Sequence, residues 1–191
     1  MRIIAGSFRS RTLAAPAGLA TRPTSDRLRE TLFNVLAPRI DGAAFLDLYA
    51  GSGAVGIEAL SRGAVRVDFV EHAPAALAAL RENLAKLGVS TGFRVHNRSV
   101  AGFVKALTAG GGSDVVFLDP PYDADREYAA TLGLLGGDSV GALAPAAMVI
   151  AEHRRKVKLE DGYGVLKRTR LLEQGDAALS FYAVGTGETG G

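Results

Sequence analysis

The sequence predicts an α/β protein with a doubly wound, mostly parallel sheet and an antiparallel end. Short apolar runs alternate with segments of helical periodicity from residue 43 onward, at 44–48, 65–71, 92–96, 114–118 and 146–152. Runs that are apolar throughout are typical of strands covered on both faces, as in parallel sheets. The segments 163–171 and 177–184 follow with no helix between them, which predicts an antiparallel hairpin and seven strands in all.

Helical segments separate these runs, and turn residues mark their ends. We expect helices at 25–37, 54–62, 74–87, 99–109 and 125–135. The first has Ser25 as a candidate N-cap and Pro38 just after its end, and the third has Pro74 in its first turn and Gly88 after its last. Before the first helix, residues 2–5 and 11–14 are expected to pair as a hairpin.

The composition excludes several classes of protein. Hydrophobic residues make up 48% and charged residues 22% of the 191, which is typical of a globular chain. There is no cysteine and only three histidines, so we expect neither a disulfide nor a metal site. Apolar runs such as 142–151 are too short to span a membrane. We expect a cytoplasmic monomer with an N-terminal extension (1–40), one main domain (41–185) and a flexible tail (186–191).

Positive charge is concentrated near the N-terminus. Residues 1–40 carry seven arginines against Asp26 and Glu30, a net charge of +5, so the rest of the chain sums to −3. A basic arm on a near-neutral body favours a polyanionic partner held through its phosphates, although a merely solvated arm is the alternative. The candidate contacts are Arg9, Arg11, Arg22 and Arg27.

A glycine-rich loop follows the first strand. It contains Tyr49, Ala50, Gly51, Ser52 and Gly53, and with Gly56 it reads G-x-G-x-x-G, a pattern found where a ligand approaches the backbone closely. Asp47 precedes the loop, and its carboxylate would repel a pyrophosphate but suits a ligand with a free ammonium group, such as S-adenosylmethionine.

Two further strand ends carry candidate cofactor contacts. Glu71 ends the second strand beside His72, and a carboxylate there can accept both hydroxyls of a ribose in either NAD or S-adenosylmethionine. Ser99 and Val100 follow the third strand and could contact an adenine, although Ser99 could equally cap the next helix.

The fourth strand ends in Asp119, Pro120, Pro121 and Tyr122, which carry the strongest chemical signal. Two prolines fix the backbone and remove two N–H donors, so the Asp119 carboxylate and the Pro120 carbonyl present hydrogen-bond acceptors. Such acceptors can hold an exocyclic amino group and free its lone pair for attack on a methyl group, while Tyr122 offers a ring for a flipped base. A proline turn that only ends the strand is the alternative.

These motifs together resemble the RsmD family, bacterial methyltransferases that modify guanine N2 in 16S ribosomal RNA. The similarity is carried by 22–34 (RPTSDRLRETLFN), 46–53 (LDLYAGSG), 56–64 (GIEALSRGA) and 119–122 (DPPY). It implies a Rossmann-like class I methyltransferase fold with S-adenosyl-L-methionine as cofactor and an assembling small ribosomal subunit as partner. Thr24 would lie over the cofactor, Asp47 and the glycine loop would hold its methionine moiety, Glu71 its ribose, and Asp119–Tyr122 the guanine. One departure is Ser99, where many related enzymes carry an acid.

Three other functions are compatible with part of the sequence. An NAD-dependent oxidoreductase would explain the glycine loop and Glu71 but not residues 119–122. A non-catalytic RNA-binding protein would explain the basic arm alone. An N6-adenine methyltransferase acting on DNA or RNA would use the same catalytic loop, since adenine also presents an amino group. A second basic cluster at 153–170 could flank the RNA or form a solvated hairpin.

Overall fold

The computed structural model describes residues 1–15, 26–107, 112–121 and 125–185. Of the predicted features, Arg22, Thr24, Ser25 and Tyr122 lie outside the described residues, as does the tail at 186–191. The chain divides into two compact units, Met1–Ser99 and Val100–Gly191.

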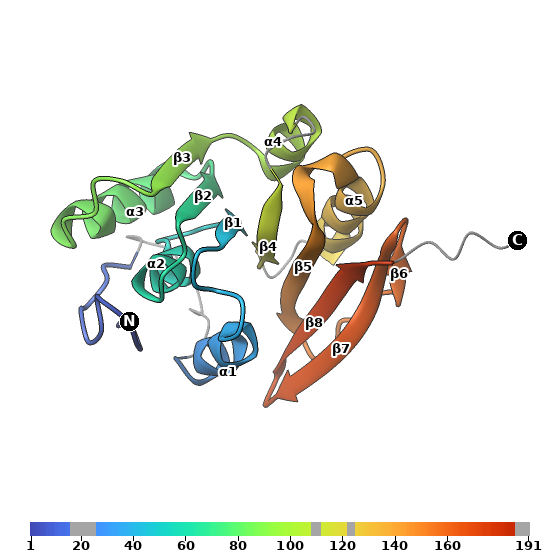
Figure 1. Ribbon diagram of the computed structural model, residues 1–191, viewed down its shortest axis with the longest axis horizontal. Helices are drawn as coiled ribbons and strands as arrows, with labels where there is room; N and C mark the ends of the chain where they lie inside the picture. Colours follow the sequence, from blue (N-terminus) through green and yellow to red (C-terminus); the bar gives the residue numbers. More distant parts are fainter. Residues whose placement is uncertain (16–25, 108–111, 122–124, 186–191) are drawn as a thin grey trace, which may run out of the picture. The chain divides into compact units, whose positions relative to one another are not determined.

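The first unit alternates helices and parallel strands (Figure 1). Its elements are α1 (Asp26–Leu36), β1 (Ala44–Leu48), α2 (Ala54–Ser61), β2 (Arg66–Glu71), α3 (Pro74–Lys86) and β3 (Phe93–Asn97). The strand order is β3-β2-β1, and all pairings are parallel, with Leu48 opposite Val70 and Val70 opposite His96. These elements confirm the predicted alternation, and they bring the carboxyl ends of three strands to one edge.

Packing in this unit depends on close contact between α2 and β2. A Cβ added at Gly56 would lie 2.3 Å from Cε1 of Phe69 and 2.9 Å from Cγ1 of Val67, so only glycine allows this approach. On α1, Leu32, Phe33 and Leu36 are buried, and Phe33 stacks on Phe45 of β1 with ring centroids 6.5 Å apart. The third glycine of the G-x-G-x-x-G pattern therefore serves helix–strand packing.

The N-terminal residues form the predicted hairpin, although it holds only one β-bridge, Arg2 with Thr12. Ile3 N–H donates to Arg11 O and Ser10 N–H donates to Ile3 O, at 3.0 and 2.9 Å. Glu58 of α2 is fully buried and accepts hydrogen bonds from the backbone N–H of Ile4 and Ala5, at 2.8 and 3.0 Å. The hairpin is therefore fixed to α2 through a buried carboxylate.

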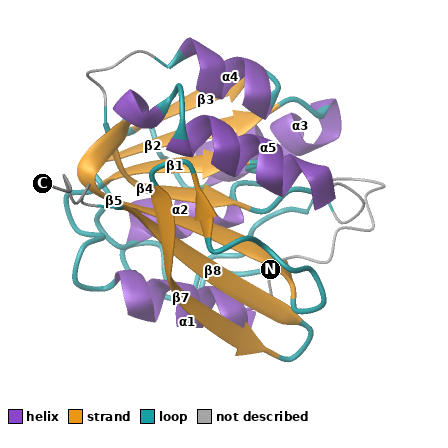
Figure 2. Cartoon of the chain, turned by 90° about the vertical axis from the view of Figure 1, so that its right-hand side faces the viewer, coloured by secondary structure: helices purple, strands orange, loops and turns teal. Residues whose placement is uncertain are grey.

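The second unit combines one parallel pair with an antiparallel end (Figure 2). Its strands β4 (Ser113–Leu118) and β5 (Leu143–Arg154) are parallel, and β5 continues to β8 (Ala177–Val184), β7 (Leu166–Gln174) and β6 (Gly162–Tyr163) by antiparallel pairing. Helices α4 (Val100–Ala106) and α5 (Asp125–Gly136) pack on each other. A 3-10 turn at Val140–Ala142 precedes β5.

Three expectations for this unit need correction. The described residues form eight strands rather than seven, because the two-residue β6 pairs with β7. The strand expected at 146–152 runs from Leu143 to Arg154, and the helix expected at 99–109 ends at Ala106. His153, which the sequence places in a basic cluster, is only 5% exposed, because it belongs to β5 and hydrogen-bonds Ser180 of β8 at 2.9 Å.

Candidate active site

The glycine loop after β1 begins with a strained residue. Tyr49 has a φ of 64°, in the left-handed region that costs a non-glycine residue about 1–2 kcal/mol. Gly51 and Gly53 also have positive φ, and Gly53 N–H closes a tight turn onto Ala50 O at 2.8 Å. A Cβ added at Gly51 would meet no atom within 4 Å, so the space before this residue is open. Backbone strain beside open space is typical of a ligand-binding loop.

Asp47 lies under this loop as a buried carboxyl group. Its side chain is 2% exposed, and its Oδ2 accepts a hydrogen bond from Gly56 N–H at 2.9 Å. Loss of water on burial raises the pKa of Asp47 from the usual 3.8 to about 7, although the Gly56 N–H opposes the shift and the charge of Glu71 adds to it. A cation bound here would favour the ionised carboxylate, so the group suits a ligand with an ammonium.

Glu71 connects the glycine loop to the start of α3. Its Oε2 accepts a hydrogen bond from Gly51 N–H at 2.9 Å, and its Oε1 accepts from His72 N–H and Ala73 N–H at 2.7 and 2.8 Å. The Glu71 side chain is 11% exposed, whereas that of His72 is 69% exposed, with its Nδ1 3.8 Å from Glu71 Oε1. Glu71 therefore shapes the loop, and one lone pair on its Oε2 remains for a hydroxyl.

Asn83 of α3 is a residue that the sequence reasoning missed. It is fully buried, its Oδ1 accepts from Ala14 N–H at 2.7 Å, and its Nδ2 donates to Ala14 O and Ser52 O at 3.1 and 3.0 Å. One amide thus holds the end of the N-terminal hairpin and the glycine loop together. A polar residue between Leu80 and Leu84 on the apolar face of the helix was the available signal.

The other predicted cofactor contacts lie at the boundary of the two units. Ser99 is the last residue of the first unit and is exposed, and Val100 begins the second and is 5% exposed as part of α4. Ser99 also takes part in an interaction within the fold. The structure keeps both residues just after β3, and their part in adenine binding stays a prediction.

Asp119, Pro120 and Pro121 follow β4 directly. The strand is paired with β5 up to Leu118, which lies opposite Ala151. Asp119 is half-buried and takes part in an interaction within the fold, Pro120 is buried and Pro121 is exposed, so the turn leaves directly from the end of a fixed strand. A rigid strand end of this kind can hold a carboxylate in one position for a partner.

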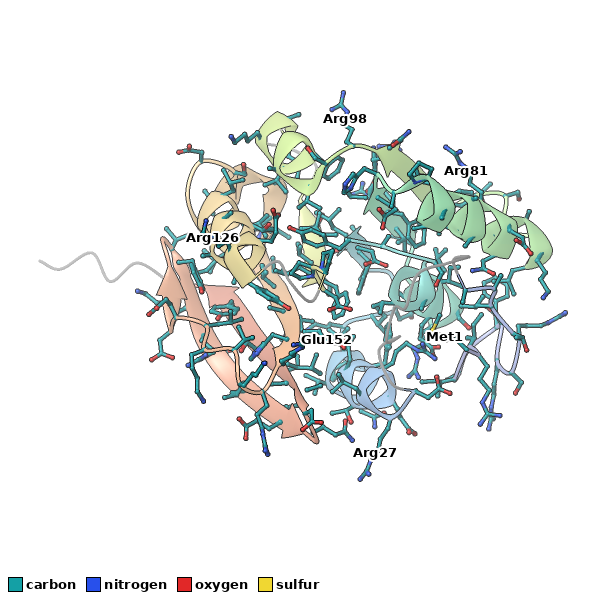
Figure 3. All side chains as sticks on the ribbon, turned by 180° about the vertical axis from the view of Figure 1, so that it is seen from behind. Met1, Arg27, Arg81, Arg98, Arg126 and Glu152 are labelled. Carbon is teal, nitrogen blue, oxygen red and sulfur yellow. The ribbon has the colours of Figure 1, made fainter. Side chains whose placement is uncertain are left out.

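The basic residues predicted to bind RNA are accessible where they are described. Arg9, Arg11 and Arg27 are exposed, and Arg27 points away from the fold (Figure 3). Arg29, by contrast, is fully buried, donates to Asp26 Oδ1 and Arg2 O at 2.9 and 2.5 Å, and lies 3.8 Å from Glu58. The cluster at the N-terminus therefore divides into exposed cations and one that fixes the hairpin.

The described residues hold neither a metal-binding cluster nor a membrane-spanning helix. No group of three His, Asp or Glu side chains is placed to hold a metal ion there. Likewise, none of the helices in the described ranges is long and apolar enough to cross a membrane.

Comparison with known proteins decides the family. Residues 1–183 match the family described as Conserved hypothetical protein 95. Ribosomal RNA small subunit methyltransferase D of Escherichia coli strain K12 is 41% identical over 152 residues, which cover 80% of this chain and 74% of that protein. The chain belongs to the RsmD family. Bacillus subtilis strain 168 has a further family relative, named "Putative rRNA methyltransferase YlbH", 38% identical over 95% of this chain and 98% of its own length.

The fold of the family agrees with the strands and helices described above. A solved structure named "Putative methyltransferase yhhF from Escherichia coli" matches with a TM-score of 0.84 and 35% identity, covering 98% of this chain and 99% of that one. The chain therefore has the Rossmann-like methyltransferase fold that the sequence predicted, with the eighth strand as the difference.

Proposed function

We propose that this chain transfers a methyl group from S-adenosyl-L-methionine to the exocyclic N2 of a guanine in small-subunit ribosomal RNA. The observation that carries the proposal is the Asp119–Pro120–Pro121 turn at the end of a paired strand, in a member of a family whose relatives are named rRNA methyltransferases. The identity of the base and of the RNA is inferred from the family, whereas transfer to an amino group is inferred from residues 119–121.

The cofactor is proposed from the first unit. Bound S-adenosylmethionine supplies an activated methyl group on a sulfonium. Asp47 would pair with the ammonium of its methionine part, the open face of Gly51 would admit its chain, and Glu71 would accept a ribose hydroxyl with the one lone pair that three backbone N–H groups leave on its Oε2. The positive φ angles of Tyr49, Gly51 and Gly53 define the shape of the glycine loop before the ligand arrives.

The target base is proposed to bind at the second unit. The Asp119 carboxylate and the Pro120 carbonyl would each accept one hydrogen from the amino group, which holds the nitrogen and directs its lone pair outward. Tyr122 would stack on the flipped base. The N–C bond would form as the bond between the methyl group and the sulfonium breaks, which makes the nitrogen acidic, and its proton would leave to Asp119 or water. Alignment and acceptor placement are the chain's contribution, so no strong base is needed.

The partner is proposed to be RNA within an assembling small subunit, approached by the exposed arginines at 9, 11 and 27 and by Arg22. The guanidinium group of arginine binds a phosphate through two parallel hydrogen bonds, which the ammonium group of lysine cannot do. The hairpin that carries Arg9 and Arg11 is fixed to the first unit by Glu58 and Asn83, so these charges would have defined positions.

Replacing Asp119 tests the proposal. We expect Asp119→Ala to lower the single-turnover rate of methyl transfer to unmethylated small-subunit RNA by on the order of 10²-fold or more, because an acceptor for the developing charge is lost. Binding of S-adenosylhomocysteine, measured by calorimetry, is expected to stay within about twofold.

The matched control is Asp114→Ala, which removes an exposed carboxylate from the start of the same strand. It is expected to keep the wild-type rate, and equal losses in both variants would assign the effect to the strand rather than to the acceptor. Mass spectrometry of the digested RNA separates N2-methylguanosine from N6-methyladenosine. Retention of a nicotinamide cofactor instead of S-adenosylhomocysteine would overturn the proposal.

A further inference from the structure

The chain has a second positively charged segment besides the N-terminal one. Residues 153–170 contain seven lysines and arginines against Glu160 and Asp161, a net charge of +5. Outside 1–40 and 153–170, eight basic residues face sixteen acidic ones. A net positive charge is therefore confined to these two segments, and only the N-terminal one is used in the proposed function.

The connection between β5 and β6 is held firmly against the sheet. Arg155 N–H donates to Asp176 O at 2.8 Å, and Arg168 Nη1 donates to Leu159 O at 3.1 Å. Tyr182 of β8 donates to Glu160 O at 2.9 Å. The backbone from 155 to 161 is thus fixed by β7, β8 and the turn between them, so a ligand that binds it loses little additional chain entropy.

A cavity of about 490 Å³ opens beside this connection. It is lined by residues 156–160, by Tyr163 of β6 and by Ala129 of α5. Glu160 N–H donates to the Tyr163 hydroxyl at 3.1 Å, and the Tyr163 ring meets Tyr182 edge-on at 5.8 Å, so the ring is held from two sides. Cavities of this size accommodate a nucleotide.

The charges around the cavity are mainly uncompensated cations. Asp161 is paired with Arg168 and so is not available to neutralise the lysines. Lys156 and Lys158 are exposed, and across the described ranges neither forms an ion pair. Arg126 is exposed on α5, three residues before Ala129 and so on the same side of the helix. Glu160 is the one acid among the lining residues.

We propose that this surface, defined by Lys156, Lys158, Tyr163 and Arg126, binds RNA outside the target base. The cations bind backbone phosphates, and an unpaired base enters the cavity against the ring of Tyr163. Single-stranded nucleic acid is the polyanion that combines regular phosphates with flat π-faces, whereas an acidic protein segment offers only carboxylates. This inference rests on the proposed function, because it assumes an RNA substrate.

The first test measures the salt dependence of RNA binding with the full chain. The probe is small-subunit ribosomal RNA transcribed without modification, and affinity is measured between 50 and 300 mM KCl. The double variant Lys156→Gln/Lys158→Gln is expected to reduce the slope of log affinity against log salt by about 1.4, the value for two lost phosphate contacts on a single strand. Arg81→Gln/Lys86→Gln removes the same charge from exposed positions of α3 (Arg81 is labelled in Figure 3) and is expected to leave the slope unchanged.

The second test isolates the ring of Tyr163. Tyr163→Leu is expected to weaken RNA affinity by on the order of tenfold without changing the salt slope, because stacking is lost and no charge is removed. Tyr163→Phe loses the hydroxyl that Glu160 contacts but keeps the ring, and is expected to bind RNA like wild type. Thermal melts of each variant confirm that the fold persists.

The outcomes separate this inference from the proposed function. Two results would show that the surface is not an RNA site although the proposed methyltransferase function holds, provided that wild type methylates the RNA. In one, the lysine variant keeps the wild-type slope. In the other, Arg81→Gln/Lys86→Gln reduces the slope as much as the lysine variant does. Equal losses in the leucine and phenylalanine variants would refute the stacking. Stronger competition by poly-glutamate than by poly-uridine would point to an acidic protein partner. Failure of wild type to methylate any RNA would instead overturn the proposed function.

Discussion

Burial gives Asp47 a pKa far above that of an ordinary carboxyl group. The sequence placed a carboxylate beside the glycine loop, and the structure buries it, so that its pKa rises to about 7. Without a ligand, the folded chain holds a proton on Asp47 between about pH 4 and 7 that the unfolded chain releases. The resulting stabilisation is present below pH 3.8 and is lost as the pH rises to about 7.

The first prediction follows from this proton. Because an ammonium group pairs with the ionised form, we expect the affinity for S-adenosylhomocysteine to weaken about tenfold for each pH unit below 7 and to level off above it. Asp47→Asn is expected to bind more weakly at pH 8 and to lose the pH dependence. Its amide oxygen still accepts the Gly56 N–H, so the unliganded variant should melt a few degrees higher than wild type at pH 8.

Calorimetry between pH 6 and 8 measures the affinity. The control is Asp41→Asn, which changes an exposed carboxyl group in the same unit and should keep the wild-type pH profile. A flat profile in wild type would mean that Asp47 does not contact the ammonium.

At the scale of elements, Asn83 joins the N-terminal hairpin, α3 and the glycine loop. Replacing it with alanine would leave Ala14 N–H, Ala14 O and Ser52 O without their partner in a buried place. We expect Asn83→Ala to lower the free energy of unfolding by about 1–3 kcal/mol, the usual cost of a buried unsatisfied group, and to weaken S-adenosylhomocysteine binding severalfold.

Chemical denaturation and calorimetry on the same samples measure both effects. Glu82→Ala, at the exposed neighbouring position of α3, should change neither quantity by more than a few tenths of a kcal/mol. Loss of stability with unchanged binding would show that Asn83 fixes the hairpin but not the loop.

The same elements show why the sequence predicted some features and not others. The strand at 44–48 was predicted to the residue, because a run of five residues between turn signals is too short for a helix. The segment 163–171 was predicted as one strand, whereas it contains part of β6 (Gly162–Tyr163) and of β7 (Leu166–Gln174), because a two-residue strand carries no periodicity of its own. Asn83 bonds a residue 69 positions away, and no local pattern reports such a partner. His153 was grouped with the arginines after it, whereas the ladder with β8 extends through Arg154 and buries it.

The candidate site, like the fold, was predicted only in part from the sequence. The sequence predicted that Gly51 and Glu71 serve one site, and the structure joins them by a hydrogen bond of 2.9 Å. It did not predict that Glu71 already accepts three N–H groups, because those bonds depend on the turn into α3. The chemistry of strand ends can thus be read locally, whereas the hydrogen bonds that position them cannot.

At the scale of the whole molecule, net positive charge is concentrated in residues 1–40 and 153–170, and the rest of the chain is acidic. A chain of net charge +2 has little overall attraction for RNA, so binding must depend on where its cations lie. Arg9 and Arg11 are exposed on a hairpin that Glu58 and Asn83 hold in place, and each is expected to bind one phosphate.

The last prediction concerns this hairpin. We expect Arg9→Gln/Arg11→Gln to reduce the log–log salt slope of RNA binding by about 1.4 and to raise the RNA concentration needed for half-maximal methylation, while the rate at saturating RNA stays near wild type. Arg9→Lys/Arg11→Lys keeps the charge but not the planar fork, so it should keep the slope and lose only part of the affinity. Filter binding over a salt series distinguishes these cases. An unchanged slope in the glutamine variant would place the phosphates elsewhere, and a loss of rate at saturating RNA would mean that the hairpin acts on the reaction itself.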